Sequence, residues 1–372
     1  MSFTSAVCVF VVTVSVLSLC VTQGLEYVLE VLVVLDKPSV ERWEPEARQA
    51  GNTLDMEVRG LMLEVNTVYR ALQAQGINIS VSLTDDRVIY AQDNILCETN
   101  TNCPPFVDSL LSLHLFKKWL DSQAFTFDAA LLITAYPFLD SNIGRAELGT
   151  VCQGGISVVA PYYDISQVQN IAHELGHVLG LDHDGETNSC PGSDGFVMRR
   201  RSSPLDRNAH TFSACSVEHL RVLLPSSQCL SPENTTAIRS PRFGQLVGAD
   251  ESCRRYTGLH VSRYYYYKGS YTRICESVVC EVSLEVISDA KFNVFGVPVR
   301  SPEGMQCESR HSCQEGHCVS DPTASPIWNK RCPFGDTPSP FSQQIQTCLD
   351  VKNQTKCDFL MWKDICCETC NM

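Results

Sequence analysis

The sequence predicts an α/β domain with a largely parallel sheet, followed by a disulfide-rich C-terminal region dominated by loops. Two observations lead to this prediction. Strand-like apolar segments alternate with amphipathic helical segments between residues 25 and 234. Beyond residue 239 there are twelve cysteines, against six in residues 25–234. The first part can bury a core of its own, whereas the second depends on disulfides for its shape.

The alternation can be followed segment by segment. Short runs rich in Val, Ile and Leu predict strands, and apolar residues spaced three and four apart predict helices. The expected strands are Tyr27–Leu35, Asn78–Leu83, Asp128–Thr134 and the β-like stretch Arg145–Ala160, which turns at Gly154-Gly155. The expected helices are Leu54–Ala74, Pro104–Ser122, Ser166–Leu179 and Ser216–Leu224.

The first 24 residues predict a secretory signal peptide. They carry no charge, and an apolar run from Val7 to Val21 is followed by Thr22-Gln23-Gly24. A membrane anchor is the alternative, which the shortness of the run disfavours because a spanning helix needs about 20 apolar residues. We expect cleavage near Gly24, and no other segment is apolar and long enough to span a bilayer.

Cysteine content and charge agree with an exported protein. Without Cys8 and Cys20 of the signal peptide, eighteen of the twenty cysteines remain, an even number that predicts a disulfide framework. Glycosylation sequons begin at Asn78, Asn234 and Asn353. The net charge of −13 argues against binding to nucleic acid or anionic membranes. We expect a secreted, extracellular, monomeric glycoprotein whose partners are proteins.

The segment 171–184 carries the pattern of a catalytic metal site. His173 and His177 are four residues apart, so on a helix their side chains lie one turn apart on the same face. Gly180 can adopt the left-handed conformation that ends a helix and returns the chain, bringing in His183 as a third ligand. Three histidines leave the fourth position of a zinc ion open to water, as catalytic sites do. Zinc is favoured over redox metals because the cysteines are committed to disulfides.

Glu174 is the candidate catalytic residue. It follows His173 directly and therefore points away from the ligand set, toward the open metal position. We expect it to act as a general base that takes a proton from a zinc-activated water and passes it to the leaving amine. The alternative is a buried amphipathic helix that carries two histidines by chance, which explains neither Gly180 nor His183.

The extended motif resembles the metzincin clan, and Asp184 after the third histidine resembles its adamalysin or reprolysin branch, the ADAM and ADAMTS-like zinc metalloproteinases. This resemblance implies a metzincin-type catalytic domain with zinc in its cleft, and a Met-turn that places Met198 beneath the zinc as an apolar floor. It also implies that an extended substrate pairs with the strand in Gly144–Cys152. The likeness continues at Glu30–Asp36, Phe127–Thr134 and Gly195–Met198, and it implies the disulfides Cys152–Cys229, Cys190–Cys215 and Cys97–Cys103.

The cysteine-rich part resembles the ADAMTS disintegrin-like and cysteine-rich region in Gln245–Cys253, Ile274–Cys280 and Gly304–Val319, and a PLAC module from Cys348 to Cys370. The polar junction at 231–241, which contains two prolines, suits an exposed linker. We therefore expect a signal peptide over 1–24, a metalloproteinase domain over 25–234, an ADAMTS-like region over 235–325 and a PLAC-like module over 326–372. No prodomain is expected between the signal peptide and the first catalytic strand.

The resemblance also implies a calcium site formed by Glu30, Asp128 and the carbonyl of Cys229. Its fourth position is Pro232 here instead of Asn or Asp, which counts against calcium binding.

The run Arg199–Arg201 follows the Met-turn, where the resemblance places the wall of a substrate subsite. We expect these arginines to disfavour basic substrate side chains at that subsite. Solvated surface arginines are an equally good interpretation of the same run.

Together these features predict a zinc metalloendopeptidase that hydrolyses peptide bonds of extracellular or matrix proteins. The alternative is an adhesion or antagonist protein that acts through its cysteine-rich region. No Arg-Gly-Asp triplet is present and all candidate ligands and the base are intact, which favours the protease. A non-proteolytic metal enzyme is disfavoured by the likeness at the Met-turn and edge strand.

Overall fold

The computed structural model divides into two compact units. The first contains residues 1–40, 65–161 and 169–239, and the second contains residues 41–64, 162–168 and 240–372. The structure describes residues 6–8, 20–22, 25–97, 103, 105–140, 142–159, 166–201, 206, 208–232, 237–238, 240–257, 262–264, 274–283, 294–299, 301–326, 347–358, 366 and 369–370.

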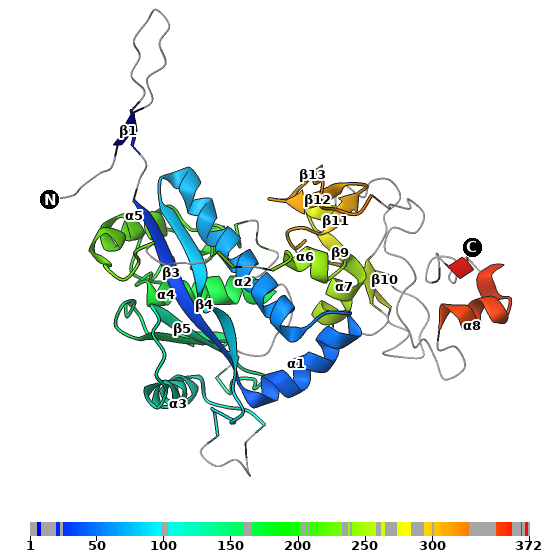
Figure 1. Cartoon of the computed structure of the whole chain (residues 1–372), viewed down its shortest axis with the longest axis horizontal. Helices are drawn as coiled ribbons and strands as arrows, with labels where there is room; N and C mark the ends of the chain where they lie inside the picture. The colour runs from blue at the N-terminus through cyan, green and yellow to red at the C-terminus, as the bar shows by residue number, and fades with distance from the viewer. Residues whose placement is uncertain are drawn as a thin grey trace, which may run out of the picture. The chain divides into compact units, whose positions relative to one another are not determined.

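The first unit is built on a five-stranded sheet with the strand order β4-β3-β5-β7-β6, of which β3, β4 and β5 are labelled in Figure 1. The first four strands are parallel, and the edge strand β6 is antiparallel to β7. The predicted α/β class with a largely parallel sheet is therefore confirmed. The strands are β3 (Glu26–Leu35), β4 (Asn78–Tyr90), β5 (Ala129–Ile133), β6 (Gly144–Ala146) and β7 (Gly155–Val159).

Helices cover both faces of this sheet. Leu32 and Val34 of β3 join Leu132 of β5 in a core cluster with α3 (Ser109–Asp121). The intervening residues of β3 and β5 are equally buried and, because successive side chains of a strand alternate, they point to the opposite face. The helices α2 (Leu54–Arg70) and α4 (Ser166–Val178) contact each other through a buried hydrogen bond of 2.9 Å from the Tyr69 hydroxyl to the Ala172 carbonyl. Burial on both faces explains why the central strands are almost wholly apolar.

The helix that follows the first central strand was not expected from the sequence. Helix α1 (Lys37–Gln49) follows β3 directly, has few apolar residues and contains an internal Pro45. Asp36 begins it as an N-cap, because its Oδ1 accepts a hydrogen bond of 3.1 Å from the Ser39 backbone N–H. Burial raises the pKa of Asp36, while hydrogen bonds from Ser39 and Thr134 favour its ionised form. The start of the helix is thus signalled by a cap rather than by an apolar stripe.

Several expected boundaries also move. Strand β4 continues to Tyr90, and α2 ends at Arg70, where the 3₁₀ helix η1 (Ala71–Gln75) begins. Helix α3 begins at Ser109 rather than at Pro104, because Asp108 caps it with a hydrogen bond of 2.8 Å from the Leu111 backbone N–H. The last helix of this unit, α5 (Ala214–Leu223), is followed by the 3₁₀ helix η3 (Leu224–Ser226).

The second unit contains short elements joined by disulfides. Besides the parts of α1 and α2 that fall within residues 41–64, its described helices are α6 (Phe243–Leu246), α7 (Ala249–Thr257) and α8 (Cys348–Asn353), the last followed by the 3₁₀ helix η6 (Lys356–Asp358). Its strands form two three-stranded antiparallel sheets: β8 (Arg263–Tyr264), β9 (Val278–Ser283) and β10 (Val294–Val299), then β11 (Gln306–Glu308), β12 (His311–Gln314) and β13 (His317–Ser320). The described disulfides are Cys253–Cys280, Cys275–Cys313, Cys307–Cys318, Cys348–Cys366 and Cys357–Cys370. The expected domain boundaries and the PLAC-like likeness stay predictions.

Three disulfides close the first unit: Cys97–Cys103, Cys152–Cys229 and Cys190–Cys215. These are the pairs that the resemblance implies. Within the expected signal peptide, the structure describes two short paired strands, β1 (Ala6–Cys8) and β2 (Cys20–Thr22). Cleavage of this segment stays a prediction.

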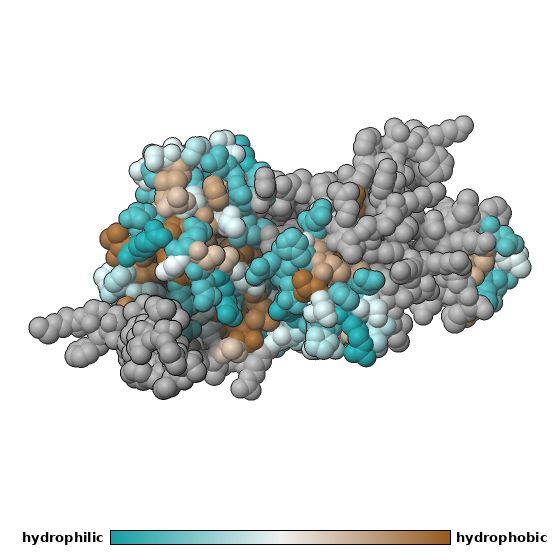
Figure 2. Space-filling view, turned by 90° about the horizontal axis from the view of Figure 1, so that it is seen from above, coloured by the Kyte–Doolittle hydropathy of each residue, from teal (hydrophilic) through white to brown (hydrophobic). Residues whose placement is uncertain are grey.

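Surface hydropathy and the exposure of the sequons are relevant to the expected secretion of the protein. On the face shown in Figure 2, the described residues are mostly hydrophilic, with scattered hydrophobic patches. Of the sequon asparagines, Asn353 is exposed, Asn78 is half-buried at the start of β4, and Asn234 lies outside the described residues. Among the helices that the structure describes, none combines the length and apolar character needed to cross a membrane.

A buried ion pair lies inside the second unit. The Arg255 guanidinium on α7 donates two hydrogen bonds, of 2.9 and 3.1 Å, to the two carboxylate oxygens of Glu57. The side chain of Arg255 is 5% exposed and that of Glu57 is 0% exposed. Arg255 Nε also donates to Glu251 at 2.7 Å, and these bonds outweigh burial to raise the pKa of Arg255. The paired charges satisfy one another inside the unit.

Replacing Arg255 by alanine is expected to destabilise the second unit by about 3–5 kcal/mol, because Glu57 would stay buried without its guanidinium partner. The double variant Glu57→Leu/Arg255→Met should recover most of this loss. The control Arg48→Ala breaks an exposed pair with Glu44 and should cost less than about 1 kcal/mol. Urea unfolding followed by circular dichroism measures all three, and equal midpoints for the Arg255 and Arg48 variants would contradict the expectation.

Candidate active site

Helix α4 positions the first three candidate residues, His173, Glu174 and His177. The helix ends at Gly180, whose φ of 91° lies in the left-handed region. The Gly180 N–H donates to the His177 carbonyl at 2.8 Å, and the Leu181 N–H donates to the Gly176 carbonyl at 2.9 Å. This pair of bonds is a Schellman motif, which reverses the chain after the helix. The expected role of Gly180 at the helix end is confirmed.

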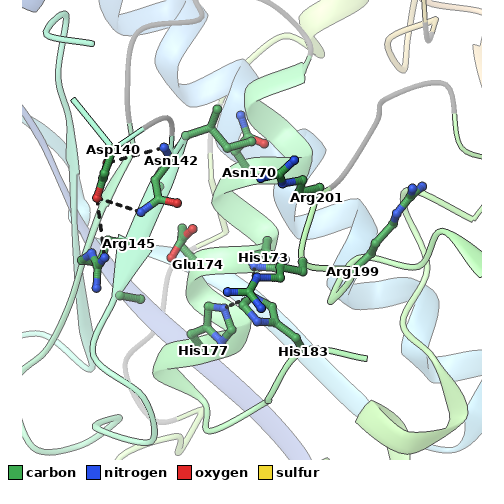
Figure 3. A pocket seen from close by; sticks show the side chains of 14 residues that line it. Asp140, Asn142, Arg145, Asn170, His173, Glu174, His177, His183, Arg199 and Arg201 are labelled. Carbon is green, nitrogen blue, oxygen red and sulfur yellow. Dashed lines mark hydrogen bonds and ion pairs between the residues drawn. The ribbon is translucent and has the colours of Figure 1, made fainter. Parts of the chain in front are cut away.

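The three histidine rings converge after this reversal (Figure 3). His183 Nε2 lies 3.2 Å from His173 Nε2 and 3.1 Å from His177 Nε2. In a tetrahedral zinc site with Zn–N bonds of 2.0–2.1 Å, ligand nitrogens stand about 3.3 Å apart. The three Nε2 atoms therefore have the spacing of a metal ligand set.

The other nitrogen of each ring is anchored. His173 Nδ1 lies 2.7 Å from the Val197 carbonyl, and His177 Nδ1 lies 2.7 Å from the Leu181 carbonyl. A carbonyl can only accept, so each Nδ1 carries the proton and each Nε2 is left with a free lone pair. Burial, with a smaller effect from His177, lowers the pKa of His173 to about 3, and burial also lowers the pKa of His177. Both rings are therefore held in the neutral form that binds a metal.

A carboxylate anchors the third histidine. His183 Nδ1 lies 3.2 Å from Glu186 Oε2, and Glu186 Oε1 accepts a hydrogen bond of 2.7 Å from Arg200. The sequence did not predict the contact of Glu186 with His183 or the hydrogen bond from Arg200 to Glu186. The only available signal was an acidic residue three positions after the last histidine, in a turn without periodicity. Such a carboxylate fixes the imidazole tautomer and ring orientation.

The expected Met-turn residue packs against helix α4. Met198 is fully buried, and its Sδ lies close to α4 at Gly176, where an added Cβ would stand 2.6 Å from the sulfur. The Met198 carbonyl accepts a hydrogen bond of 2.9 Å from the Asp184 N–H. The Ser213 hydroxyl in turn donates to Asp184 Oδ1 at 2.7 Å. The segment after the third histidine is thereby tied to the turn that supports the first.

Glu174 lies between the histidines and the edge strand. Its side chain rests against Gly144 of β6, where an added Cβ would stand 2.3 Å from Glu174 Oε1 and 2.7 Å from its Cγ. Glu174 Oε2 is buried without a hydrogen-bond partner among the described residues. Burial raises the pKa of Glu174 to about 8, and the nearby Arg145 charge opposes that effect. A buried carboxylate with an unused oxygen beside a metal ligand set can accept a proton from a bound molecule.

A cleft of about 900 Å³ surrounds these groups. Arg145 beside it donates a hydrogen bond of 2.7 Å from Nε to the Ser109 hydroxyl, and its Nη2 lies 3.6 Å from Asp140 Oδ2. This Arg145–Ser109–Asp140 cluster joins β6 to the start of α3, and the sequence analysis did not anticipate it. The residues that line the cleft are Asp140, Asn142, Ile143, Gly144, Arg145, Ala146, Asn170, His173, Glu174, His177, His183, Arg199, Arg200 and Arg201.

Two of the three candidate calcium ligands lie together. The Glu30 N–H donates to Asp128 Oδ2 at 2.9 Å, and burial together with the Glu30 charge raises the pKa of Asp128 to about 6. Cys229 is bonded to Cys152, and the next residue, Leu230, accepts a hydrogen bond of 3.2 Å from the Val28 N–H. The segment after Cys229 therefore runs beside the start of β3. Calcium binding stays a prediction.

A second group of side chains of the kind that can bind a metal ion lies in the second unit. Cys275, Cys307 and Cys313 are close enough to share an ion. All three are committed to disulfides, so they offer no thiolate ligand.

Known proteins are similar in sequence to this chain. A family model described as "Reprolysin (M12B) family zinc metalloprotease" matches residues 27–233. Zinc metalloproteinase-disintegrin-like atragin of Naja atra is 33% identical over 158 residues, which cover 39% of this chain and 25% of that protein. A zinc metalloproteinase/disintegrin of Bitis gabonica is 29% identical over 147 residues, covering 37% of this chain and 44% of that protein.

One relative is similar along most of the chain. The human protein "A disintegrin and metalloproteinase with thrombospondin motifs 10" is 25% identical over 344 residues, which cover 84% of this chain and 28% of that protein. This chain therefore spans from a quarter to less than half of the length of these relatives. The family match covers more than half of this chain and includes the whole histidine cluster, its Met-turn and the edge strand. With a converging three-histidine set inside that match, this chain belongs to the reprolysin (M12B) family of zinc metalloproteases.

Proposed function

We propose that this chain is a zinc metalloendopeptidase that hydrolyses peptide bonds of extracellular or matrix proteins, with His173, His177 and His183 as the metal ligands and Glu174 as the general base. The observation that carries the proposal is the convergence of the three Nε2 atoms beside the unpartnered carboxylate oxygen of Glu174. When bound there, zinc supplies Lewis-acid polarisation of the substrate carbonyl and lowers the pKa of water.

The edge strand β6 binds the substrate backbone in this proposal. It is the last strand of the described sheet, so its outer N–H and C=O groups are available to an extended peptide. Gly144 brings that peptide next to Glu174, because the carboxylate occupies the space of the missing Cβ. Glu174 then accepts the proton of the attacking water and delivers it to the amine that leaves.

Secretion is part of the same proposal. The expected signal peptide, the eight described disulfides and the exposed sequon at Asn353 support an oxidising, extracellular compartment. Calcium is not part of this proposal, because Pro232 occupies the expected fourth ligand position.

Glu174→Gln is expected to lower kcat by about 100-fold to 10,000-fold, because glutamine cannot take up the proton. Its zinc content should stay at the wild-type level. Hydrolysis of a denatured protein substrate, with zinc measured by atomic absorption, tests both statements. A zinc chelator should abolish wild-type hydrolysis, and substantial activity of Glu174→Gln would refute the assigned base.

Glu186→Ala is expected to weaken zinc binding by about 10-fold to 100-fold, because His183 would lose the carboxylate that orients its ring. Competition with a coloured chelator measures the zinc Kd directly, without reliance on activity. The control is Glu218→Ala, which removes an exposed carboxylate from α5. An unchanged zinc Kd for Glu186→Ala would show that the carboxylate does not support the ligand.

Gly144→Ala is expected to lower kcat by about 100-fold, because the new Cβ would push the Glu174 carboxylate out of position. Zinc affinity should not change, because no ligand contacts Gly144. The control is Gly248→Ala, whose added Cβ has no heavy atom within 4 Å. Equal kcat values for the two variants would mean that Glu174 does not need this approach to the edge strand.

A further inference from the structure

The cleft beside the histidines has an excess of arginines. Four of them line it, Arg145, Arg199, Arg200 and Arg201, whereas Asp140 is the only carboxylate among the lining residues besides Glu174. Because the whole chain carries a net charge of −13, this local positive charge runs against the overall balance. An uncompensated positive charge in a cleft favours ligands of the opposite sign.

Three of the four arginines are engaged within the protein. Arg145 is held by Ser109 and Asp140, as described above. Arg199 donates to the Asp206 carboxylate. Arg200 donates to Glu186, the carboxylate that orients His183. Their charges are therefore largely compensated by partners on the protein.

Arg201 differs from these three. It is exposed, and it has no hydrogen-bond or ion-pair partner among the residues that the structure describes. In Figure 3 its side chain extends toward Asn170, whereas Arg199 extends away from the histidines. Asn170 precedes Glu174 by four residues on α4, so this side of the cleft is one helical turn from the catalytic carboxylate. A substrate side chain next to the reacting bond can reach this position.

We propose that Arg201 selects substrates with an aspartate or glutamate flanking the scissile bond, an inference that rests on the proposed proteolytic function. A guanidinium presents a planar set of donors that matches a carboxylate and forms two parallel hydrogen bonds with it. A lysine or arginine of the substrate at the same position is repelled. Arg199 and Arg200 contribute less, because their donors are occupied by Asp206 and Glu186.

The size of the effect follows from the exposure of Arg201. Exposed ion pairs are individually weak, so attraction of a glutamate alone changes kcat/KM by about fivefold or less. Comparing glutamate with lysine adds repulsion to attraction, and we expect about a tenfold difference in kcat/KM between such peptides. The difference shrinks at high salt, because a solvent-accessible charge is screened.

The test uses the full, zinc-loaded chain and quenched fluorescent peptides that differ at a single position among the three residues on either side of the scissile bond. Each position carries Glu, Gln or Lys in turn. Wild type should cleave the Glu peptide about tenfold faster than the Lys peptide at one or more positions, and Arg201→Glu should reverse this order. The control Lys118→Glu makes the same charge change at an exposed position of α3 outside the cleft and should keep the wild-type order.

A binding measurement separates this inference from the proposed function. The variant Glu174→Gln, with and without Arg201→Glu, is titrated with the same peptides by fluorescence anisotropy. Tighter binding of the Glu peptide that is reversed by Arg201→Glu supports the inference, even if no peptide is hydrolysed. Hydrolysis without charge preference overturns the role of Arg201 alone, and a Glu preference that survives Arg201→Glu does the same. Absence of both hydrolysis and binding overturns the proposed function together with the inference.

Discussion

At Gly180 the backbone enters the left-handed region, and the paired hydrogen bonds of the Schellman motif turn the chain back over the last turn of α4. This reversal positions two of the candidate ligands at once. It returns the Leu181 carbonyl to Nδ1 of His177, which fixes the tautomer of that ring, and it carries His183 into contact with both helical histidines. A side chain with a Cβ at position 180 would strain that conformation. The arrangement of the three histidines therefore depends on the left-handed conformation of Gly180.

Close approaches of other elements complete the site. Met198 packs against α4 and Glu174 packs against β6, in each case at a glycine that leaves room for the neighbouring side chain. These contacts hold the carboxylate in a buried position, where its pKa is raised. A bound cation would favour the ionised carboxylate again, so burial and metal charge act in opposite directions on the same group. The pKa of Glu174 thus depends on its packing.

The two units are stabilised by different means. The first has a continuous core between a sheet and helices on both faces, and its three described disulfides close loops around that core. In the second, half-cystines such as Cys253, Cys280 and Cys307 are themselves among the fully buried residues. Their bridges restrict the unfolded chain and replace apolar burial that short elements cannot provide. The buried Glu57–Arg255 pair adds a polar contact that tolerates no loss of one partner.

Local sequence patterns were sufficient to predict much of the fold and of the candidate site. The buried strands β3 and β5, helix α4 and the turn at Gly180 follow from apolar runs, helical spacing and the freedom of glycine, because each depends on neighbours within a few residues. Helix α1 could not be predicted in this way, because it has few apolar residues and its start is marked by the Asp36 cap. Only the tertiary structure decided the contacts between segments distant in sequence: Val197 with His173, Gly144 with Glu174, and Arg145 with Ser109. The tertiary structure also distinguishes Arg201 from Arg199 and Arg200, which the sequence does not. Arg199 and Arg200 lie next to carboxylates that come from other parts of the chain, Asp206 and Glu186.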